Sequence, residues 1–289
     1  MKSIKGYTTE GNFVTRTGQS IAYSLHSKDA GPNNPAKSPR SIESVKPRIT
    51  LIHSLAMTRD FWAPTVDLLV DHADILTFDV RGHGKSPLDG GAFTADDVAE
   101  DLSNLLMNMG WKNSAIAGAS MGGCLGLAFA AKYPDKTSGL CLIDSTAWYG
   151  EEAPDRWSER AATASREGMI ALADFQKTRW FSDQFRSTNP SLVEWTMSIF
   201  EKNDVNSFKE TCKMMGEFDM REDLASLKMP VSIIVGEQDY ATPLQMSEFL
   251  HQSIKGSTLN VIKGARHLTP LECPLIVSNH LINLLSRIQ

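Results

Sequence analysis

The sequence predicts an α/β fold with a mostly parallel, eight-stranded sheet flanked by helices, and with a helical lid inserted after the sixth strand. The main observation is a series of six short apolar runs separated by segments of helical length: RITLIH, ADILTFD, SAIAGAS, SGLCLID, VSIIVG and TLNVIK. Continuous apolar runs suit strands buried on both faces, and their alternation with helices indicates a parallel sheet. The alternation fails once, between Ile143 and Val231, where a helical pattern continues without a strand. That gap predicts the inserted lid.

Two further strands precede these runs. NFVTRT and IAYSLH alternate apolar and polar residues on either side of a Gly-Gln-Ser turn, which predicts a hairpin. Residues 27–48 then form a stretch rich in Pro, Ser and Asn without any period, which predicts an exposed loop. We therefore expect an α/β core domain made of residues 1–145 and 227–289, with residues 146–226 as the lid. The helices are expected in FWAPTVDLLVDH, TADDVAEDLSNLLMNMG, MGGCLGLAFAAKYP, PLQMSEFLHQSI and PLIVSNHLINLLSRI.

Composition excludes several classes of function. The chain has 289 residues, a formal net charge of −5 and no run of Lys and Arg, which argues against nucleic acid as a partner. No segment approaches the roughly 20 apolar residues of a membrane-spanning helix, and the N-terminal stretch lacks the apolar run of a secretion signal. The four cysteines are scattered without metal-ligand spacing. These features predict a cytoplasmic protein without a membrane partner, and leave open whether it is a monomer or a homo-oligomer.

The strongest chemical motif is Gly118-Ala119-Ser120-Met121-Gly122, a GxSxG sequence directly after an apolar run and directly before a predicted helix. A serine placed on such a sharp strand-to-helix turn is exposed as a nucleophile, and glycines on both sides remove side chains that would collide. GxSxG also occurs in ordinary glycine-rich turns, so the strand and helix around it carry the argument. We predict Ser120 as the nucleophile.

A serine hydroxyl needs a base, and the base needs an acid that orients it. Two later strand-like runs end in these residue types: VSIIVGEQD ends at Asp239, and TLNVIKGARH ends at His267. The chain order Ser, Asp, His is the one expected for this motif. Asp144 and Glu237 are the alternative acids, because Asp144 also ends a strand-like run. We predict Ser120, Asp239 and His267 as a catalytic triad.

The negative charge that develops on an acyl oxygen needs hydrogen-bond donors already aimed at it. The amide of Met121, just after the nucleophile, is one expected donor. Ser54-Leu55-Ala56, which follows the first apolar run and His53, is the loop expected to supply the other. We therefore predict the Leu55 and Met121 amides as an oxyanion hole. The remaining histidines, including His83, His251 and His280, are expected in structural or surface roles.

The segments RITLIHSLAMTRDFW, FDVRGHGKSP, AGASMGG, GEQDYATP and GARHLTPLECP resemble the α/β-hydrolase superfamily over essentially the whole chain. Within it the chain resembles the 3-oxoadipate enol-lactonase group, through Ser54-Leu55, the lid entry DSTAWYGEEAPDRWSERAA, Arg179-Trp180-Phe181 and HLTPLE after the base. Three features depart from that group: His53 where an asparagine is usual, Ala56 where a glycine is usual, and the insertion 27–48. Because of these departures, the resemblance does not determine the identity of the substrate.

The expected substrate contacts lie around the lid, which is dense in aromatic residues and methionine. Arg179 is the candidate for receiving a substrate carboxylate, because its guanidinium group offers a bidentate fork; Arg59 and Arg266 compete for that role. Any one of these residues equally suits a role in packing or as a solvated charge. The expected substrate-binding residues are Ser54, Trp148, Arg179, Trp180 and Leu268.

The resulting prediction is a serine hydrolase that cleaves a small-molecule ester or lactone through an acyl-enzyme, most similar to an enol-lactonase. This chemistry requires no metal and no organic cofactor. A general carboxylesterase, an acyl-homoserine-type lactonase and a C–C bond hydrolase remain alternatives, and a ligand-sensing receptor that retains the triad is the alternative of a different class.

Overall fold

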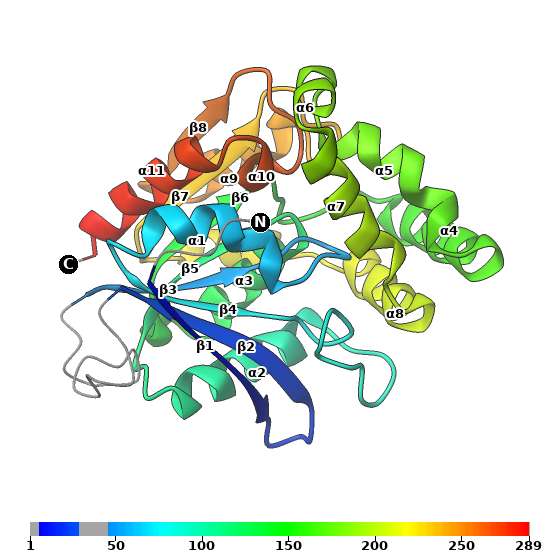
Figure 1. The fold of residues 1–289 in the computed structure, drawn as a ribbon. Helices are drawn as coiled ribbons and strands as arrows, with labels where there is room; N and C mark the ends of the chain where they lie inside the picture. The colour runs from blue at the N-terminus through cyan, green and yellow to red at the C-terminus, as the bar shows by residue number, and fades with distance from the viewer. Residues whose placement is uncertain (1–5, 29–45, 289) are drawn as a thin grey trace.

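The computed structural model describes residues 6–28 and 46–288. It contains an eight-stranded sheet with the strand order β1-β2-β4-β3-β5-β6-β7-β8 (Figure 1). The strands are β1 Tyr7–Val14, β2 Ser20–Ser27, β3 Arg48–Ile52, β4 Asp74–Phe78, β5 Ser114–Ala119, β6 Thr137–Ile143, β7 Val231–Gly236 and β8 Thr258–Ile262. The six strands from β3 to β8 pair in parallel, whereas β1 and β2 pair antiparallel with each other and β2 pairs antiparallel with β4. The predicted sheet and hairpin are confirmed.

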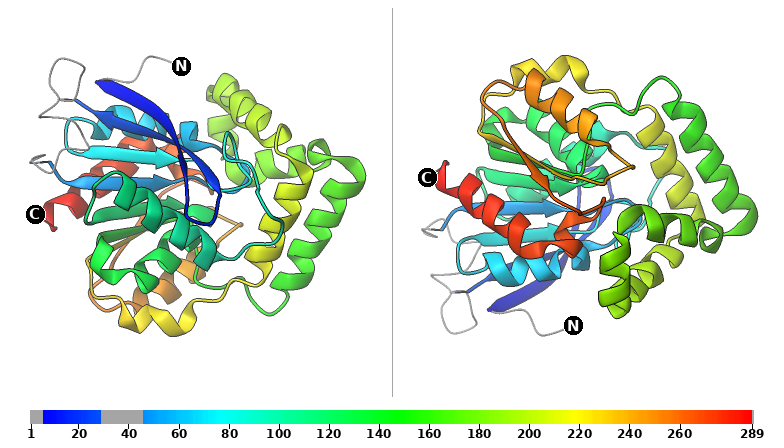
Figure 2. Two further views of the ribbon diagram at one scale, coloured as in Figure 1. Left: turned by 90° about the horizontal axis from the view of Figure 1, so that it is seen from below. Right: turned by 90° about the horizontal axis from the view of Figure 1, so that it is seen from above.

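Helices cover both faces of this sheet. The two helices α1 and α11 pack together on one face, and α2 and α3 pack together on the other (Figure 2). The helices that flank the sheet are α1 Ala63–Leu69, α2 Ala95–Asn108, α3 Met121–Lys132, α9 Leu244–Ser253, α10 Thr269–Glu272 and α11 Pro274–Ser286. The central strand β5 is buried along its whole length, as its uninterrupted apolar sequence requires.

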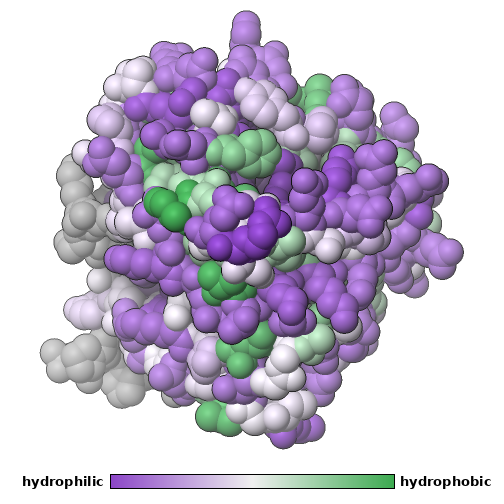
Figure 3. All heavy atoms as spheres, turned by 90° about the vertical axis from the view of Figure 1, so that its right-hand side faces the viewer, coloured by the Kyte–Doolittle hydropathy of each residue, from purple (hydrophilic) through white to green (hydrophobic). Residues whose placement is uncertain are grey.

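Five helices lie between β6 and β7, in the part of the chain where the sequence has no strand pattern. They are α4 Ala153–Glu167, α5 Ala173–Trp180, α6 Asp183–Thr188, α7 Pro190–Glu201 and α8 Val205–Gly216. We call residues 146–226 the helical insertion. It lies beside the sheet, and the face that it presents to solvent is mainly hydrophilic with small separate apolar patches (Figures 1 and 3). The division of the chain into two domains at these residues stays a prediction.

The exposed loop predicted at residues 27–48 falls largely outside the described residues. Ser27 ends β2 and Arg48 begins β3, so the described ends of this segment belong to the sheet. All four cysteines are free. In the described part of the chain, no helix is long and apolar enough to cross a membrane.

Candidate active site

The site forms where the parallel strands end. Ser120 follows β5, Asp144 follows β6, Asp239 lies three residues after β7, and His267 lies five residues after β8. Because parallel strands present their carboxyl ends at one edge of a sheet, these residues from distant parts of the sequence meet there. The helical insertion borders the same edge (Figure 1).

Ser120 occupies a strained turn between β5 and α3. Its φ is 54° and its ψ is −119°, a left-handed conformation that is unusual for a residue with a side chain. A Cβ at Gly118 would lie 2.0 Å from the Gly122 carbonyl oxygen, and one at Gly122 would lie 2.1 Å from the Ile52 carbonyl oxygen. Only glycine fits at both positions, as the sequence motif predicted.

Ser120, His267 and Asp239 form a continuous hydrogen-bonded chain. The Ser120 Oγ lies 2.8 Å from His267 Nε2, and His267 Nδ1 lies 2.7 Å from Asp239 Oδ2. All three side chains are buried. A carboxylate only accepts hydrogen bonds, so Nδ1 carries the ring proton and Nε2 is left as an acceptor for the serine proton.

The carboxylate of Asp239 is held in one orientation by its own loop. Oδ1 accepts from the Ala241 and Thr242 amides at 2.7 and 3.0 Å, and Oδ2 accepts from the Thr242 hydroxyl at 2.9 Å. These donors occupy both oxygens of the carboxyl group and fix its rotation. Asp239 can therefore fix the imidazole ring and stabilise an imidazolium.

The alternative acids have other partners. Asp144 is fully buried and accepts from the Gly236 amide at 3.0 Å, and from the amide and hydroxyl of Thr269 at 2.9 and 2.7 Å. Burial and the negative charge of Asp239 raise the pKa of Asp144 well above its ordinary value. Asp144 thus connects the end of β7 to the segment that follows His267. Glu237 is exposed and accepts from the Gly264 amide at 2.9 Å.

The loop expected to form half of an oxyanion hole is held by His53. The Val80 amide donates to His53 Nε2 at 3.0 Å, so the ring proton is on Nδ1, which donates to the Ser54 carbonyl at 2.8 Å. The Ser54 carbonyl and the Leu55 amide belong to the same trans peptide group and point in opposite directions. By holding the carbonyl, His53 sets the direction of the Leu55 amide.

Asn203, from the helical insertion, holds the same loop from the other side. Ala56 has a φ of 56°, and its carbonyl accepts from the Asn203 side-chain amide at 2.8 Å. In the described part of the chain, neither the Leu55 amide nor the Met121 amide donates to a main-chain carbonyl outside its own element. Both amides are thus available to a ligand, which is what an oxyanion hole needs.

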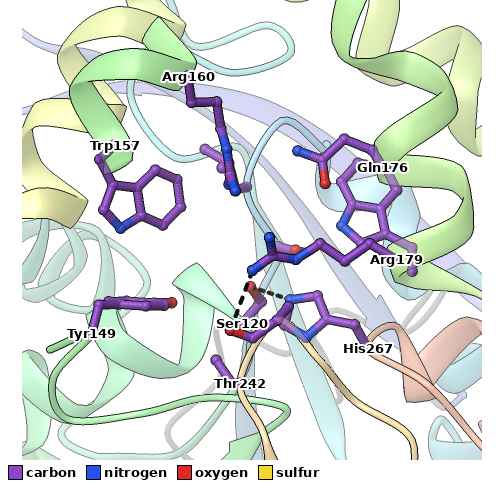
Figure 4. A pocket seen from close by; sticks show the side chains of 12 residues that line it. Ser120, Tyr149, Trp157, Arg160, Gln176, Arg179, Thr242 and His267 are labelled. Atoms are coloured by element: carbon purple, nitrogen blue, oxygen red, sulfur yellow. Dashed lines mark hydrogen bonds between the residues drawn. The ribbon is translucent and has the colours of Figure 1, made fainter. Parts of the chain in front are cut away.

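A narrow cavity opens above the serine. Four of its lining residues were predicted as substrate contacts or hole donors, namely Ser54, Leu55, Arg179 and Trp180. Tyr149 and Trp157 also line it and belong to the lid aromatic residues that were expected around the substrate, whereas Arg160 and Gln176 have no signal in the sequence. Figure 4 shows that Arg160 and Arg179 both extend into this cavity, with Trp157 and Tyr149 on one side and Gln176 on the other.

Two other predicted substrate contacts do not line the cavity. The ring of Trp148 lies under the Arg221 guanidinium group at 3.7 Å, and its main chain pairs with Asp219. Leu268 is fully buried, and its amide donates to the Trp180 carbonyl at 3.1 Å. Neither residue is among those that line this cavity, and their role as substrate contacts stays a prediction.

The competing arginines are also occupied elsewhere. Arg59 is buried in an ion pair with Asp79. Arg266 donates to the Thr178 and Phe181 carbonyls at 2.8 Å each and pairs with Asp183. Of the three arginines considered from sequence, Arg179 is the one that lines the cavity.

Comparisons with known proteins agree with this geometry. Residues 47–274 match a family model described as the alpha/beta hydrolase fold. Over 228 residues the chain is 30% identical to 3-oxoadipate enol-lactonase 1 of Acinetobacter baylyi, which covers 79% of this chain and 84% of the relative. Among solved structures, the enol-lactonase from Burkholderia xenovorans LB400 superposes with a TM-score of 0.86 at 26% identity, over 96% of this chain and all of the other. A thermophilic esterase from Thermogutta terrifontis, solved with malate bound, superposes with a TM-score of 0.85 at 25% identity, over 97% of this chain and 99% of the other.

Proposed function

The chain belongs to the alpha/beta hydrolase fold family, and on this premise we propose that it is a serine hydrolase that cleaves a small-molecule ester or lactone through an acyl-enzyme. The family and its relatives identify a hydrolase of the ester or lactone type. The observation that carries the finer proposal is the hydrogen-bonded chain Ser120–His267–Asp239, of which Ser120 and His267 line a cavity.

In the first half of the proposed reaction, His267 Nε2 takes the proton from Ser120 Oγ as this oxygen attacks the acyl carbon. The acyl oxygen becomes negatively charged and is received by the Leu55 and Met121 amides. When the tetrahedral intermediate collapses, the bond to the leaving oxygen breaks, and His267 gives its proton to that oxygen. An ester releases an alcohol, whereas the leaving group of a lactone stays attached to the acyl-enzyme.

In the second half, a water molecule gives a proton to His267 Nε2 and attacks the acyl carbon. The bond to Ser120 Oγ breaks, the serine recovers its proton, and the acid product leaves. In a lactone, hydrolysis competes with reclosure of the ring by the tethered hydroxyl. We propose that the helical insertion acts as a lid that limits access of bulk water to this step.

Within this class we propose a lactone that bears a carboxylate, held by Arg179. Arg179 lines the cavity and extends over Ser120 and His267 (Figure 4). The two enol-lactonases of Acinetobacter baylyi support this substrate class, at 28% and 30% identity. The malate bound to the Thermogutta terrifontis esterase is a dicarboxylate, which also supports an acidic ligand. A general carboxylesterase is the second candidate, because that esterase is as similar in fold as the enol-lactonase.

A substrate panel tests the proposal. The purified protein is given p-nitrophenyl acetate, p-nitrophenyl butyrate and 3-oxoadipate enol-lactone, with Ser120→Ala as the blank. Turnover of the lactone well above both esters supports the lactonase, and turnover of the esters alone selects the carboxylesterase. If Ser120→Ala retains the activity of the unaltered protein, the serine mechanism is wrong.

Arg179→Ala tests the carboxylate contact in the same panel. Its KM for the acidic lactone should rise, while its KM for the neutral esters should change little. Arg166 lies on α4 and is exposed beside Glu167, so Arg166→Gln is the matched control. Equal effects of Arg179→Ala on acidic and neutral substrates would contradict this role.

A further inference from the structure

Two arginines occupy successive positions above the nucleophile. Arg179, from α5, extends over Ser120 and His267, and Arg160, from α4, extends into the same cavity (Figure 4). Both arginines line the cavity above Ser120. They also line an adjoining cavity, to which Arg156 and Tyr240 contribute. The two arginines therefore lie at the boundary between the cavity above Ser120 and the adjoining cavity.

Their side chains have spare hydrogen-bonding capacity. Arg179 donates one hydrogen bond, to the Ala241 carbonyl at 3.3 Å, and Arg160 lies 4.5 Å from the centre of the Trp157 ring. Within the described residues neither arginine forms an ion pair. Gln176 lines the same cavity and is 1% exposed. Its side-chain amide offers a donor and an acceptor to a ligand in the cavity.

The charges around the two cavities are unbalanced. The lining residues include Arg156, Arg160 and Arg179 but no Asp or Glu among those that the structure describes. The nearby carboxylate, Asp239, is already bound to His267 and to its own loop. Burial, together with the positive charge of Arg160, lowers the pKa of Arg179 to about 10, which leaves the group charged at neutral pH. Asp239 offsets one of the three arginine charges, so a dianionic ligand would balance the remaining two.

We infer that the substrate carries two acidic groups, the first bound by Arg179 and the second by Arg160 together with Gln176. This inference rests on the proposed function, because the ester or lactone carbonyl must reach Ser120 while both acidic groups are bound. A single carboxylate at Arg179 would already use the bidentate fork of that residue. Arg160 and Gln176 line the same cavity and would then take no part in binding. The substrate class is therefore a small ester or lactone with two carboxylates.

Binding to the Ser120→Ala protein tests this inference without turnover. Isothermal titration calorimetry compares glutarate with monomethyl glutarate, which has the same chain and one charge fewer. We expect glutarate to bind roughly tenfold more tightly or better, the effect of one additional charge-assisted pair. Arg160→Gln should reduce that ratio to near one, and Gln176→Ala should reduce it partly. Arg160→Lys keeps the charge and should keep most of the ratio.

The ratio separates this inference from its competitors. If both arginines clamp one carboxylate, Arg160→Gln weakens both ligands equally and the ratio is unchanged, which overturns the inference. If the second carboxylate of glutarate binds at the oxyanion hole instead, Arg160→Gln again leaves the ratio unchanged, and the inference is overturned. The inference is also overturned if neither glutarate nor monomethyl glutarate binds the Ser120→Ala protein that carries the control substitution Arg166→Gln. A preference for glutarate in a protein that hydrolyses none of the panel substrates would refute the proposed function alone.

Discussion

Lowering the pH should destabilise this protein through His53, and the size of the effect follows from its surroundings. Burial lowers the pKa of His53 from 6.5 to about 4. Between these values the unfolded chain binds a proton at this position and the folded chain does not, so stability falls as the pH falls. The slope is about 1.4 kcal/mol per pH unit, and the loss over the whole window is about 3 kcal/mol.

The geometry explains why the folded state rejects this proton. The added proton would be placed on His53 Nε2, which already accepts from the Val80 amide at 3.0 Å. His83 is also buried, with its ring 5.1 Å from that of His53, and burial lowers its pKa to about 3. Burial lowers the pKa of His26 to about 4 in the same way. In the unaltered protein, the contributions of the three histidines to the pH dependence of the free energy of unfolding therefore add together.

Urea unfolding at pH 7, 6 and 5, followed by tryptophan fluorescence, measures the slope. His53→Asn should be less stable at pH 7 by roughly 1–3 kcal/mol, because Val80 or Ser54 loses a buried partner. More importantly, its stability should depend less steeply on pH, by about 1.4 kcal/mol per unit. His72 is exposed, so His72→Asn is the control that should keep the full slope. An unchanged slope in His53→Asn would refute the reasoning.

Three further predictions concern the site. Ser120→Ala should abolish nearly all turnover and leave the far-ultraviolet circular dichroism spectrum intact, since among the described residues the hydroxyl forms no hydrogen bond other than that with His267. Asp239→Asn should lower kcat by about 10⁴, because an amide favours the wrong imidazole tautomer, whereas Asp144→Asn should mainly lower the melting temperature; the reverse pattern in the two assays would transfer the role of acid to Asp144. Ala56→Gly should raise the free energy of unfolding by about 0.5–1 kcal/mol in urea titrations, because Ala56 has a φ of 56° that glycine adopts without strain.

The sequence predicted the parts of the site that follow strands. Ser120 directly follows β5, and Asp239 and His267 lie three and five residues after β7 and β8. Parallel strands present such positions at one edge, so a linear pattern was enough to bring them together. The chain order favoured Asp239 over Asp144, although both follow strands. In the structure their partners differ, because Asp239 binds His267 whereas Asp144 binds Thr269.

The helical insertion was predicted as a helical segment, but its contacts were not. Arg160 and Gln176 line the cavity because of the way in which α4 and α5 pack. A helical sequence pattern predicts which residues share a face of the helix, but not which part of the protein that face contacts. Trp148 was selected for its size and position near β6, yet it lies under Arg221 away from the cavity. Side chains in inserted helices are therefore the part of such a site that requires a structure.

The hydrogen bond from Asn203 to the Ala56 carbonyl has a consequence for engineering this chain. It makes the helical insertion a structural support for the loop that is expected to stabilise the transition state. Exchange of residues 146–226 for those of a relative, made to change substrate preference, would remove this support unless the incoming segment places an amide at the same point. Chimaeras should therefore be designed with Asn203 retained, and their losses in rate should be examined first at this contact.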